Sequence, residues 1–409
     1  MKTKILCSFL MLTFFSSANF AMSRLNTIGS EEKKSSVDAI KQQIITIEKD
    51  RVIKRANKLL DVKPQTVTAF SCPRSEGGKH DFFSEGPYWW PDKENPNGPY
   101  IRHDGVRNPD RFDHHDSDLD NFSWIVSSET SAYVLTRDQK YVKAALLHLN
   151  AWFVDTATRM NPSLNYAQAI KGVCSGRGIG IIDAVPLIDV AQSVMILAES
   201  PYASKKDISN IKDWFKQFIA WLNTHPYGID EMNAENNHGT WWHTQVAAYA
   251  RLVGDQKALQ LCADFYKNKL IPKQMVLNGS FPLELERTNP YSYSQFNLEA
   301  MTSLAWSLSG SSFEVWNYAM PDGRGLNKGL NFIYPYLKDK AQWPYNKDIA
   351  HWENPPSARP FMLYAALALD NQEWFSLWKS LDEKSKGDAS HKSMTFKNPI
   401  IYLNTNIKL

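Results

Sequence analysis

The apolar residues of this chain recur at helical spacing along most of its length, and runs of alternating strand character are few and short. The clearest repeat ends ahead of Pro226, and Asp207 or Ser209 is a suitable cap at its start. A second repeat is closed by Gly254, a residue type common just beyond a helix. The pattern predicts an all-α chain of helix pairs joined by loops. Its positions are Ile211, Trp214, Phe215, Phe218, Ile219 and Leu222, then Trp242, Val246, Tyr249, Ala250 and Val253, with repeats from Leu187 and Met301 and further helices near 36–60, 121–136, 138–154, 256–269, 325–337 and 359–381.

The first 21 residues have the pattern of a cleaved secretory signal. Lys2 and Lys4 precede an apolar run from Ile5 to Phe15, followed by a small-residue stretch that ends at Ala18 or Ala21. The apolar run is shorter than the ~20 residues that a membrane-spanning helix needs. No low-complexity linker marks a domain boundary in the remainder. We therefore expect a signal peptide at residues 1–21, one domain over residues 22–409, and an exported protein, either periplasmic or secreted.

Charge and cysteine content exclude several classes of protein. Without residues 1–21 the chain has 44 basic and 43 acidic side chains, so it has no general attraction for nucleic acid. A polyanion would need a local cluster of positive groups. The remaining cysteines, Cys72, Cys174 and Cys262, have no metal-binding spacing and allow one disulfide at most.

Two loops are too long and too rich in aromatic residues to be simple connections. They span residues 84–105 and 160–180, and long ordered loops in compact domains tend to be functional. Their aromatic side chains could seal the end of a helical barrel or stack on sugar rings. The GRGIG stretch at 176–180 lacks the lysine and the strand-to-helix context of a phosphate-binding loop, so nucleotide binding is not expected.

The stretch ENNHGTWWHTQ, residues 235–245, gathers amide and imidazole groups at the start of a predicted helix. Asn236 or Asn237 can cap this helix, because asparagine is a preferred N-cap residue. A cap needs only one of them, however, and free backbone N–H groups at a helix start also favour an anion. The alternative interpretation is an anion site in which Asn237 and His238 donate to a carboxylate.

A second constellation lies in LELERTNPYSYSQFNLEAM, residues 283–301, where Tyr293 follows Arg287 by six positions. Structurally, Arg287 could pair with Glu284 or Glu286, and Tyr293 could start a helix. Chemically, a guanidinium beside a phenol lowers the phenol pKa from its usual value of about 10 and makes it a usable proton carrier.

These two stretches together resemble the alginate lyases that fold as helical toroids. The resemblance implies an incomplete (α/α) toroid of about five to seven helical hairpins with long aromatic loops, and a lyase that cleaves a polyuronate without a cofactor. It implies that Asn237 and His238 neutralise the substrate carboxylate, with Arg287 as their partner and Tyr293 as the catalytic tyrosine. The arginine-to-tyrosine spacing in the best-known branch of that family is one residue longer than the spacing from Arg287 to Tyr293, so Tyr291 is the alternative. The motifs that carry the resemblance are NNHGTWW (236–242), ERTNPYSYSQFNLEA (286–300), PYWWPD (87–92), GPYIRHDG (98–105), TATRMNPSLNYAQAI (156–170) and GRGIGIIDA (176–184).

The chemistry of β-elimination requires these residue types. The C5 proton lies next to a carboxylate, so the C5 anion forms only if preorganised donors stabilise its enolate-like charge. A phenolate at Tyr293 can take that proton, and the resulting phenol can protonate the leaving oxygen if both lie on one face of the sugar. This syn geometry fits mannuronate or glucuronate. For guluronate the two positions lie on opposite faces, and His238 is the candidate base.

The same motifs predict a sugar-binding groove covered by the 84–105 loop as a lid. DHHDSD, residues 113–118, lacks the glycine and distal glutamate of a calcium loop and is interpreted as a solvated lead-in to a helix. We therefore predict no required metal and no cofactor. The residues expected to bind sugar are Tyr88, Trp89, Tyr166, Gln168, Arg177 and Trp241.

Two other functions remain open on the sequence alone. A glycoside hydrolase could pair carboxylates among Glu284, Glu286 and Asp183. A non-catalytic protein could bind uronate oligomers without turnover. The expected lyase acts on an anionic polysaccharide, most simply mannuronate-containing alginate, with glucuronan or another polyuronate as the alternative.

Overall fold

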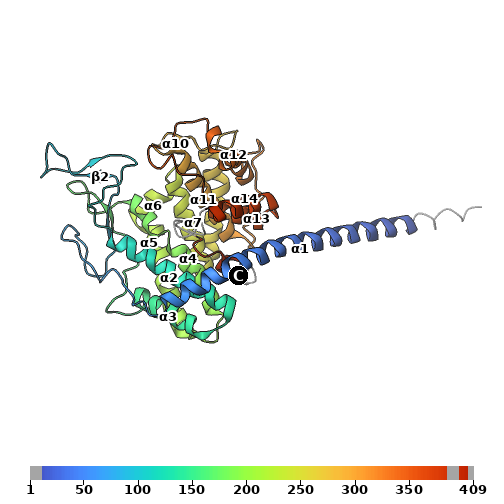
Figure 1. Cartoon of the computed structure of the whole chain (residues 1–409), viewed down its shortest axis with the longest axis horizontal. Helices are drawn as coiled ribbons and strands as arrows, with labels where there is room; N and C mark the ends of the chain where they lie inside the picture. Colours follow the sequence, from blue (N-terminus) through green and yellow to red (C-terminus); the bar gives the residue numbers. More distant parts are fainter. Residues whose placement is uncertain (1–11, 385–395, 404–409) are drawn as a thin grey trace, which may run out of the picture.

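The computed structural model describes residues 12–384 and 396–403, with side chains from residue 36 onward. Residues 1–11 of the expected signal peptide lie outside the described residues. The described chain is mostly helical (Figure 1). Its helices are α1 (Leu12–Leu59), α2 (His114–Thr136), α3 (Gln139–Phe153), α4 (Leu187–Ala198), α5 (Lys205–Thr224), α6 (Pro226–Met232), α7 (Asn237–Val253), α8 (Gln256–Phe265), α9 (Ile271–Gln274), α10 (Pro282–Leu285), α11 (Pro290–Leu308), α12 (Leu326–Lys338), α13 (Pro360–Ala368) and α14 (Gln372–Lys384), with shorter turns η1 (Gly178–Ala184), η2 (Tyr266–Leu270), η3 (Lys340–Gln342) and η5 (Pro399–Tyr402).

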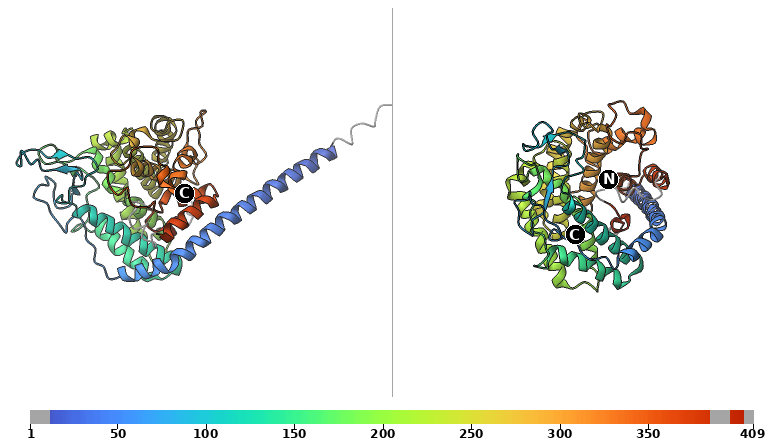
Figure 2. Two further views of the ribbon diagram at one scale, coloured as in Figure 1. Left: turned by 45° about the horizontal axis from the view of Figure 1, so that its top comes forward. Right: turned by 60° about the vertical axis from the view of Figure 1, so that its left-hand side comes forward.

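The helices form two layers around a common centre (Figure 2). Helices α2, α4, α7, α11 and α13 are mostly buried, and each packs against the next in that order. Helices α3, α5, α8, α12 and α14 cover them from outside, and α1 packs against α2 and α13. The outer helix α5 buries one face, made of Ile208 and the six apolar positions found in the sequence. The predicted all-α toroid of helix pairs is thus confirmed.

Several helix ends differ from the sequence expectation. The side chain of Ser204 accepts from the Asp207 N–H, so α5 is capped earlier than either expected residue. Gly254 ends α7 in the left-handed region at φ 81°, as expected. The single helix expected at 359–381 is two helices, α13 and α14, because the chain turns through Asp370 at φ 52°.

The DHHDSD stretch is not the solvated lead-in that we expected. Helix α2 already begins at His114, and the side chains of His115 and Asp118 are buried. His115 Nδ1 accepts from the Phe83 N–H at 3.0 Å, while its Nε2 atom lies 3.2 Å from the Phe70 carbonyl oxygen. The imidazole therefore fastens the start of α2 to the strand that precedes the 84–105 loop.

Two small sheets join the long loops at one end of the body (Figure 1). Strand β1 (Phe83–Glu85) pairs in parallel with β4 (Tyr166–Ala169), and β2 (Trp89–Trp90) pairs antiparallel with β3 (Ile101–Arg102). The Tyr100 N–H also donates to the Lys171 carbonyl at 3.0 Å. The two aromatic loops expected to be functional therefore lie side by side.

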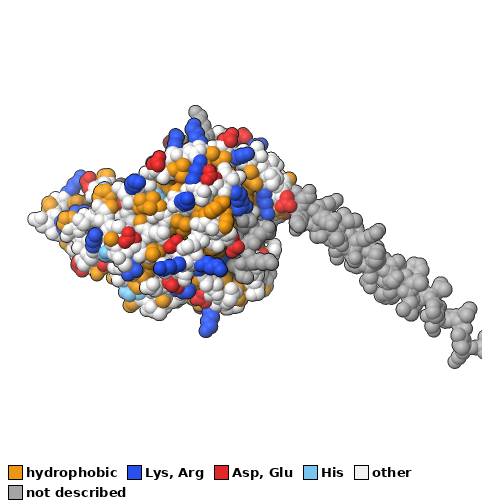
Figure 3. All heavy atoms as spheres, turned by 90° about the horizontal axis from the view of Figure 1, so that it is seen from below, with side chains coloured by type: hydrophobic (Ala, Val, Ile, Leu, Met, Phe, Trp, Pro, Cys, Tyr) orange, Lys and Arg blue, Asp and Glu red, His pale blue; other side chains and the backbone are white. Residues whose placement is uncertain are grey.

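Within the described residues, no single helix has the length and apolar composition of a membrane span; the bent pair η1 and α4 meets that test only when taken together. Cys72, Cys174 and Cys262 are free thiols in this structure. Charged side chains of both signs are scattered over the face seen in Figure 3, as the nearly balanced composition implies.

Candidate active site

A cavity of about 550 Å³ lies where the N-terminus of α7 meets the 84–105 loop and the first turn of α11. It brings together residues that are up to about 200 positions apart in the sequence. Eight of the ten predicted site residues line it: Tyr88, Trp89, Gln168, Arg177, Asn237, His238, Arg287 and Tyr293.

The two asparagines at the start of α7 have different partners. The side chain of Asn236 accepts from the His238 N–H at 3.2 Å and is the helix cap. The Asn237 backbone N–H and Nδ2 donate to the two carboxyl oxygens of Glu284, at 2.6 Å and 2.8 Å. Burial raises the pKa of Glu284, although these donors and Arg287 act in the opposite direction. Asn236 is therefore the cap, and Asn237 is held in the cavity wall by a buried carboxyl group.

His238 is oriented by a carboxyl group that the sequence did not reveal as part of the site. Its Nδ1 atom lies 2.6 Å from Oε1 of Glu231, a buried residue in α6. Because Nδ1 is engaged, Nε2 is the ring nitrogen left for a ligand in the cavity. Burial lowers the pKa of His238, but the charges of Glu231 and Glu284 outweigh it, so the pKa is raised from its usual value.

Arg287 and Tyr293 are in direct contact. Arg287 Nη2 donates to the Tyr293 hydroxyl at 2.8 Å, and the guanidinium lies 3.8 Å from the centre of the phenol ring. The hydroxyl of Tyr88 is 2.9 Å from that of Tyr293. The pKa of Tyr293 is raised, however, because burial and Tyr88 outweigh the effect of Arg287. The lowered phenol pKa expected from the sequence is thus wrong, since sequence spacing carries no information on the burial of Tyr293.

The cavity lining also includes an arginine, Arg177, that is held by Gln168. Arg177 donates from Nε to the Gln168 carbonyl and from Nη2 to Gln168 Oε1, both at 3.0 Å. Gln168 sits in the left-handed region at φ 49°, a conformation that costs energy and often marks functional sites. The guanidinium lies 5.9 Å from the centre of the Trp89 ring. A cation beside an aromatic face suits recognition of a sugar acid.

Two carboxyl groups also line the cavity beside Gln168: Asp183, considered in the sequence for a hydrolase, and Asp116, considered as part of the DHHDSD stretch. Asp183 accepts from Gln168 Nε2 at 2.8 Å and from the Ser84 hydroxyl at 2.5 Å. Asp116, in the first turn of α2, accepts from Arg111 at 2.8 Å. Burial raises the pKa of both carboxyl groups, and the charge of Asp183 raises that of Asp116 further. The two groups therefore do not ionise independently.

Two predicted sugar-binding residues do not line the cavity. The Trp241 side chain is fully buried, with its ring centre 5.0 Å from that of Phe296, so it supports the cavity wall from behind. Tyr166 packs against Phe83, Ala169 and the backbone at Gly77. The expectation for Trp241 is therefore wrong, and Tyr166 is half-buried outside this cavity. A residue next to a functional motif in sequence can point into the core, because successive helix positions face different directions.

Tyr291, the alternative catalytic tyrosine, also lies away from the cavity. Its ring is buried against Trp343, and its hydroxyl donates to the Tyr336 carbonyl at 3.2 Å. Of the carboxylates considered for a hydrolase, Glu284 is bound to Asn237 and Glu286 is exposed outside the cavity, while Asp183 lines the cavity together with Asp116.

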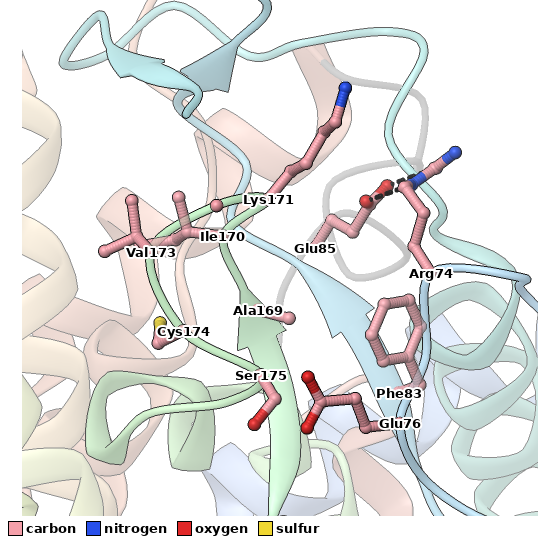
Figure 4. A pocket seen from close by; sticks show the side chains of 11 residues that line it. Arg74, Glu76, Phe83, Glu85, Ala169, Ile170, Lys171, Val173, Cys174 and Ser175 are labelled. Atoms are coloured by element: carbon pink, nitrogen blue, oxygen red, sulfur yellow. Dashed lines mark hydrogen bonds and ion pairs between the residues drawn. The ribbon is translucent and has the colours of Figure 1, made fainter. Parts of the chain in front are cut away.

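A second hollow of about 400 Å³ adjoins the first at Glu85 (Figure 4). Arg74 donates to both oxygens of Glu85, at 2.5 Å and 2.6 Å, and Figure 4 shows this pair at the rim of the hollow. Glu85 also accepts from the Phe112 N–H at 2.7 Å. Glu85 thus links Arg74 to the backbone at Phe112 in the wall between the two hollows.

Comparisons of the sequence and of the structure with known proteins point to the same family. The family model described as "Alginate lyase" matches residues 66–343, more than half of the chain. An alginate lyase from Bacteroides ovatus is similar in structure, with a TM-score of 0.77, 30% sequence identity, and coverage of 91% of this chain and 97% of that one. A histidine-to-alanine variant of alginate lyase A1-III bound to a tetrasaccharide shares the fold, with a TM-score of 0.52, 14% identity, and coverage of 79% and 88%.

No curated protein sequence matches this chain. The family match and the similarity to the Bacteroides ovatus enzyme nevertheless agree with the motifs and with the toroid of helix pairs. The chain belongs to the alginate lyase family and is a polysaccharide lyase.

Proposed function

We propose that this protein cleaves the mannuronate blocks of alginate by β-elimination, with Asn237, His238, Arg287 and Tyr293 as the reaction centre. The observation that carries the proposal is the meeting of these four residues in one cavity, with the Tyr293 hydroxyl in contact with Arg287. A uronate needs donors for its carboxylate and a proton carrier within reach of C5, and this cavity offers both.

The carboxylate binds at the start of α7. The positive end of the α7 dipole favours an anion at this point, while the Asn237 and His238 N–H groups are already bound to Glu284 and Asn236. His238 presents Nε2, and its raised pKa favours the charged imidazolium. Arg287 adds a second cation, and Asn237 completes the group. Neutralising the carboxylate lets negative charge develop at C5, and loss of one such donor typically costs about 2.7–4 kcal/mol.

The proton is carried by Tyr293. Its phenol must lose a proton before it can take one from C5, and the Tyr88 hydroxyl at 2.9 Å offers a route. The C5–H bond then breaks toward the phenolate, the C4–O bond breaks, and the phenol proton passes to the leaving oxygen. Because one oxygen serves both steps, the two positions must lie on one face of the sugar. This requirement supports mannuronate as the substrate and glucuronate as the second candidate.

The neighbouring sugar unit is expected to contact Trp89 and Arg177, which line the same cavity. The aromatic face of Trp89 provides a stacking surface, and Arg177 provides a cation for a second carboxylate. All of these steps use protein side chains, so we propose an enzyme that needs no metal and no cofactor.

Export is part of the proposal. The charged, apolar and small-residue pattern of residues 1–21 supports cleavage of a signal peptide and a periplasmic or secreted enzyme. Residues 22–409 would then form one catalytic domain. Nearly all buried apolar side chains in the described residues belong to one cluster, which supports that division.

The test is a panel of purified polymers: polymannuronate, polyguluronate, glucuronan and a neutral polysaccharide. Elimination leaves a conjugated unsaturated uronate that absorbs in the ultraviolet, and hydrolysis does not. We expect strong alkene formation on polymannuronate, weaker formation on glucuronan, and none on the neutral polymer. New reducing ends without absorbance would indicate a hydrolase, and binding without turnover a lectin-like protein.

A further inference from the structure

Asp104 in the 84–105 loop forms an ion pair with Arg287, an interaction that links the loop to the reaction centre. Asp104 Oδ1 lies 3.0 Å from Arg287 Nη2, and Oδ2 lies 3.3 Å from Nε. Two more donors reach the same carboxylate: Arg102 Nη2 at 2.6 Å and the Thr288 hydroxyl at 3.1 Å. Four donors thus hold the Asp104 carboxylate in place, and this carboxylate binds one edge of the Arg287 guanidinium.

The hydrogen bonds to Asp104 determine which nitrogen of Arg287 remains available to a substrate. A guanidinium is planar and presents its donors in a fixed fork. With Nε and Nη2 bound by Asp104, and Nη2 also donating to Tyr293, the Nη1 group makes no hydrogen bond within the described part of the chain. Arg287 lines the cavity, so Nη1 is the donor left for a substrate carboxylate.

The loop is built to bring Asp104 this close. The next residue, Gly105, has φ +77°, and a Cβ atom there would lie 2.4 Å from the Thr288 hydroxyl oxygen. Only glycine tolerates this backbone conformation at that approach. The N–H of the preceding residue, His103, donates to the Tyr88 carbonyl at 2.8 Å, so the segment that carries Asp104 is tied to the residue that contacts Tyr293.

We propose that Asp104 is a positioning residue of the reaction: it sets the plane of the Arg287 guanidinium so that one arginine serves both Tyr293 and the substrate carboxylate. Arg287 then reaches its working orientation only when the 84–105 loop is seated. This inference rests on the proposed function and assigns a role to a residue that makes no contact with the reacting atoms.

The charge of Asp104 gives the proposal a distinctive readout. Burial raises the pKa of Asp104, but the hydrogen bonds and charge of Arg287 outweigh it and lower the pKa to about 2. The group is therefore ionised at any working pH. The groups that act on the Tyr293 hydroxyl are Tyr88, Arg287 and Asp104, and the negative charge of Asp104 raises the phenol pKa.

The experiment compares Asp104→Asn with Asp92→Asn, the same chemical change in the same loop. Asp92 accepts only from the nearby Glu94 N–H within the described residues. An asparagine at 104 keeps the shape, but its NH2 group cannot accept from Arg287. We expect kcat/KM on polymannuronate to fall about 10- to 100-fold, mostly in kcat. We also expect the rising limb of the pH profile to shift to lower pH, because the phenol is easier to ionise.

A longer carboxylate separates charge from geometry. Asp104→Glu keeps the charge but displaces the guanidinium, so kcat should fall with no shift of the rising limb. Thermal unfolding of each variant shows whether it is folded. If Asp104→Asn does not fold, the activity of Asp104→Glu alone decides the outcome. Full activity of Asp104→Glu overturns the proposal. It is also overturned if Asp104→Asn matches Asp92→Asn, or if only KM changes. A wild-type protein without lyase activity would instead refute the proposed function.

Discussion

The Nδ1 atom of His238 lies 2.6 Å from the Oε1 atom of Glu231, although Glu231 itself does not line the cavity. The carboxylate stands behind the imidazole and determines which nitrogen faces the substrate. It also helps to raise the pKa of His238 above its usual value. A residue outside the cavity therefore controls both the direction and the charge of a residue inside it.

Replacing Glu231 by glutamine should weaken substrate binding in a pH-dependent way. Without the carboxylate the pKa of His238 falls, so the imidazolium is lost at a lower pH and KM begins to rise there. We expect kcat/KM to fall about 10- to 100-fold near neutral pH, the scale of one charge-assisted hydrogen bond. KM measured against pH tests this. Glu286→Gln, at an exposed carboxylate outside the cavity, is the matched control. A KM profile unchanged from wild type would contradict the role of Glu231.

The pH dependence of kcat follows from Tyr293. Burial and Tyr88 raise its pKa, so the phenolate forms only in alkaline solution. We expect kcat on polymannuronate to rise between about pH 7 and pH 10, above the ordinary range of histidine titration. A rate that peaks in mild acid and then falls would mean that Tyr293 works only as a neutral phenol.

The first turn of α11 depends on Asp348, which lies in the segment after η3. Its carboxylate accepts from the N–H groups of Tyr291 and Ser292, at 2.9 Å and 3.1 Å. Asp348→Ala should lower the free energy of unfolding by about 0.5–2 kcal/mol, as loss of a helix cap does. Activity should also fall, because Tyr293 sits in the same turn.

The control for Asp348 is Asp339→Ala. Asp339 caps the short turn η3 by accepting from the Ala341 N–H at 3.0 Å, and it does not line the cavity. Urea unfolding should show a loss of stability in both variants, and the lyase assay a loss of activity only in Asp348→Ala. Equal activities would show that the cap has no influence on the reaction centre.

Glu129 predicts a pH-dependent stability. Its side chain is fully buried in α2, and neither carboxyl oxygen has a hydrogen-bond partner in the described part of the chain. Burial raises its pKa from 4.5 to about 8. Between these values the folded protein keeps a proton that the unfolded chain has released. The free energy of unfolding therefore falls as pH rises through this window.

Glu129→Gln should remove that dependence. The neutral amide avoids the cost of ionising a buried carboxyl group, so the variant should exceed wild type by about 1–3 kcal/mol near pH 8 and by less near pH 5. Chemical unfolding at several pH values measures the difference. Glu199→Gln, at an exposed position, is the control. A constant difference at all pH values would argue against a buried protonated carboxyl group.

The sequence predicted most helices because helix packing leaves a periodic trace. The apolar positions of α5 and the glycine that ends α7 are found where the pattern placed them. The break between α13 and α14 was missed, since a single left-handed residue at Asp370 leaves no periodic signal. Boundaries depend on local dihedral angles, which several residue types can adopt.

The site was predictable in part. Asn237, His238, Arg287 and Tyr293 stood out by residue type and local pattern, and the family resemblance gave them their roles. No spacing rule could have brought Tyr88 to Tyr293. Trp241 was misplaced because its burial is set by the packing of α7 against α11. The supporting carboxylates Asp104 and Glu231 were missed, because acidic residues in loops and short helices are common and only their contacts distinguish them.

The most direct test of the central claim is alkene formation by Tyr293→Phe on the best polymer of the panel. Tyr291→Phe is the matched control, because Tyr291 lies two positions away and donates to the Tyr336 carbonyl instead of facing the cavity. Our account predicts almost no turnover by Tyr293→Phe, with substrate binding and unfolding temperature near wild type, and nearly full activity in Tyr291→Phe. Substantial alkene formation without the hydroxyl at 293 would contradict it.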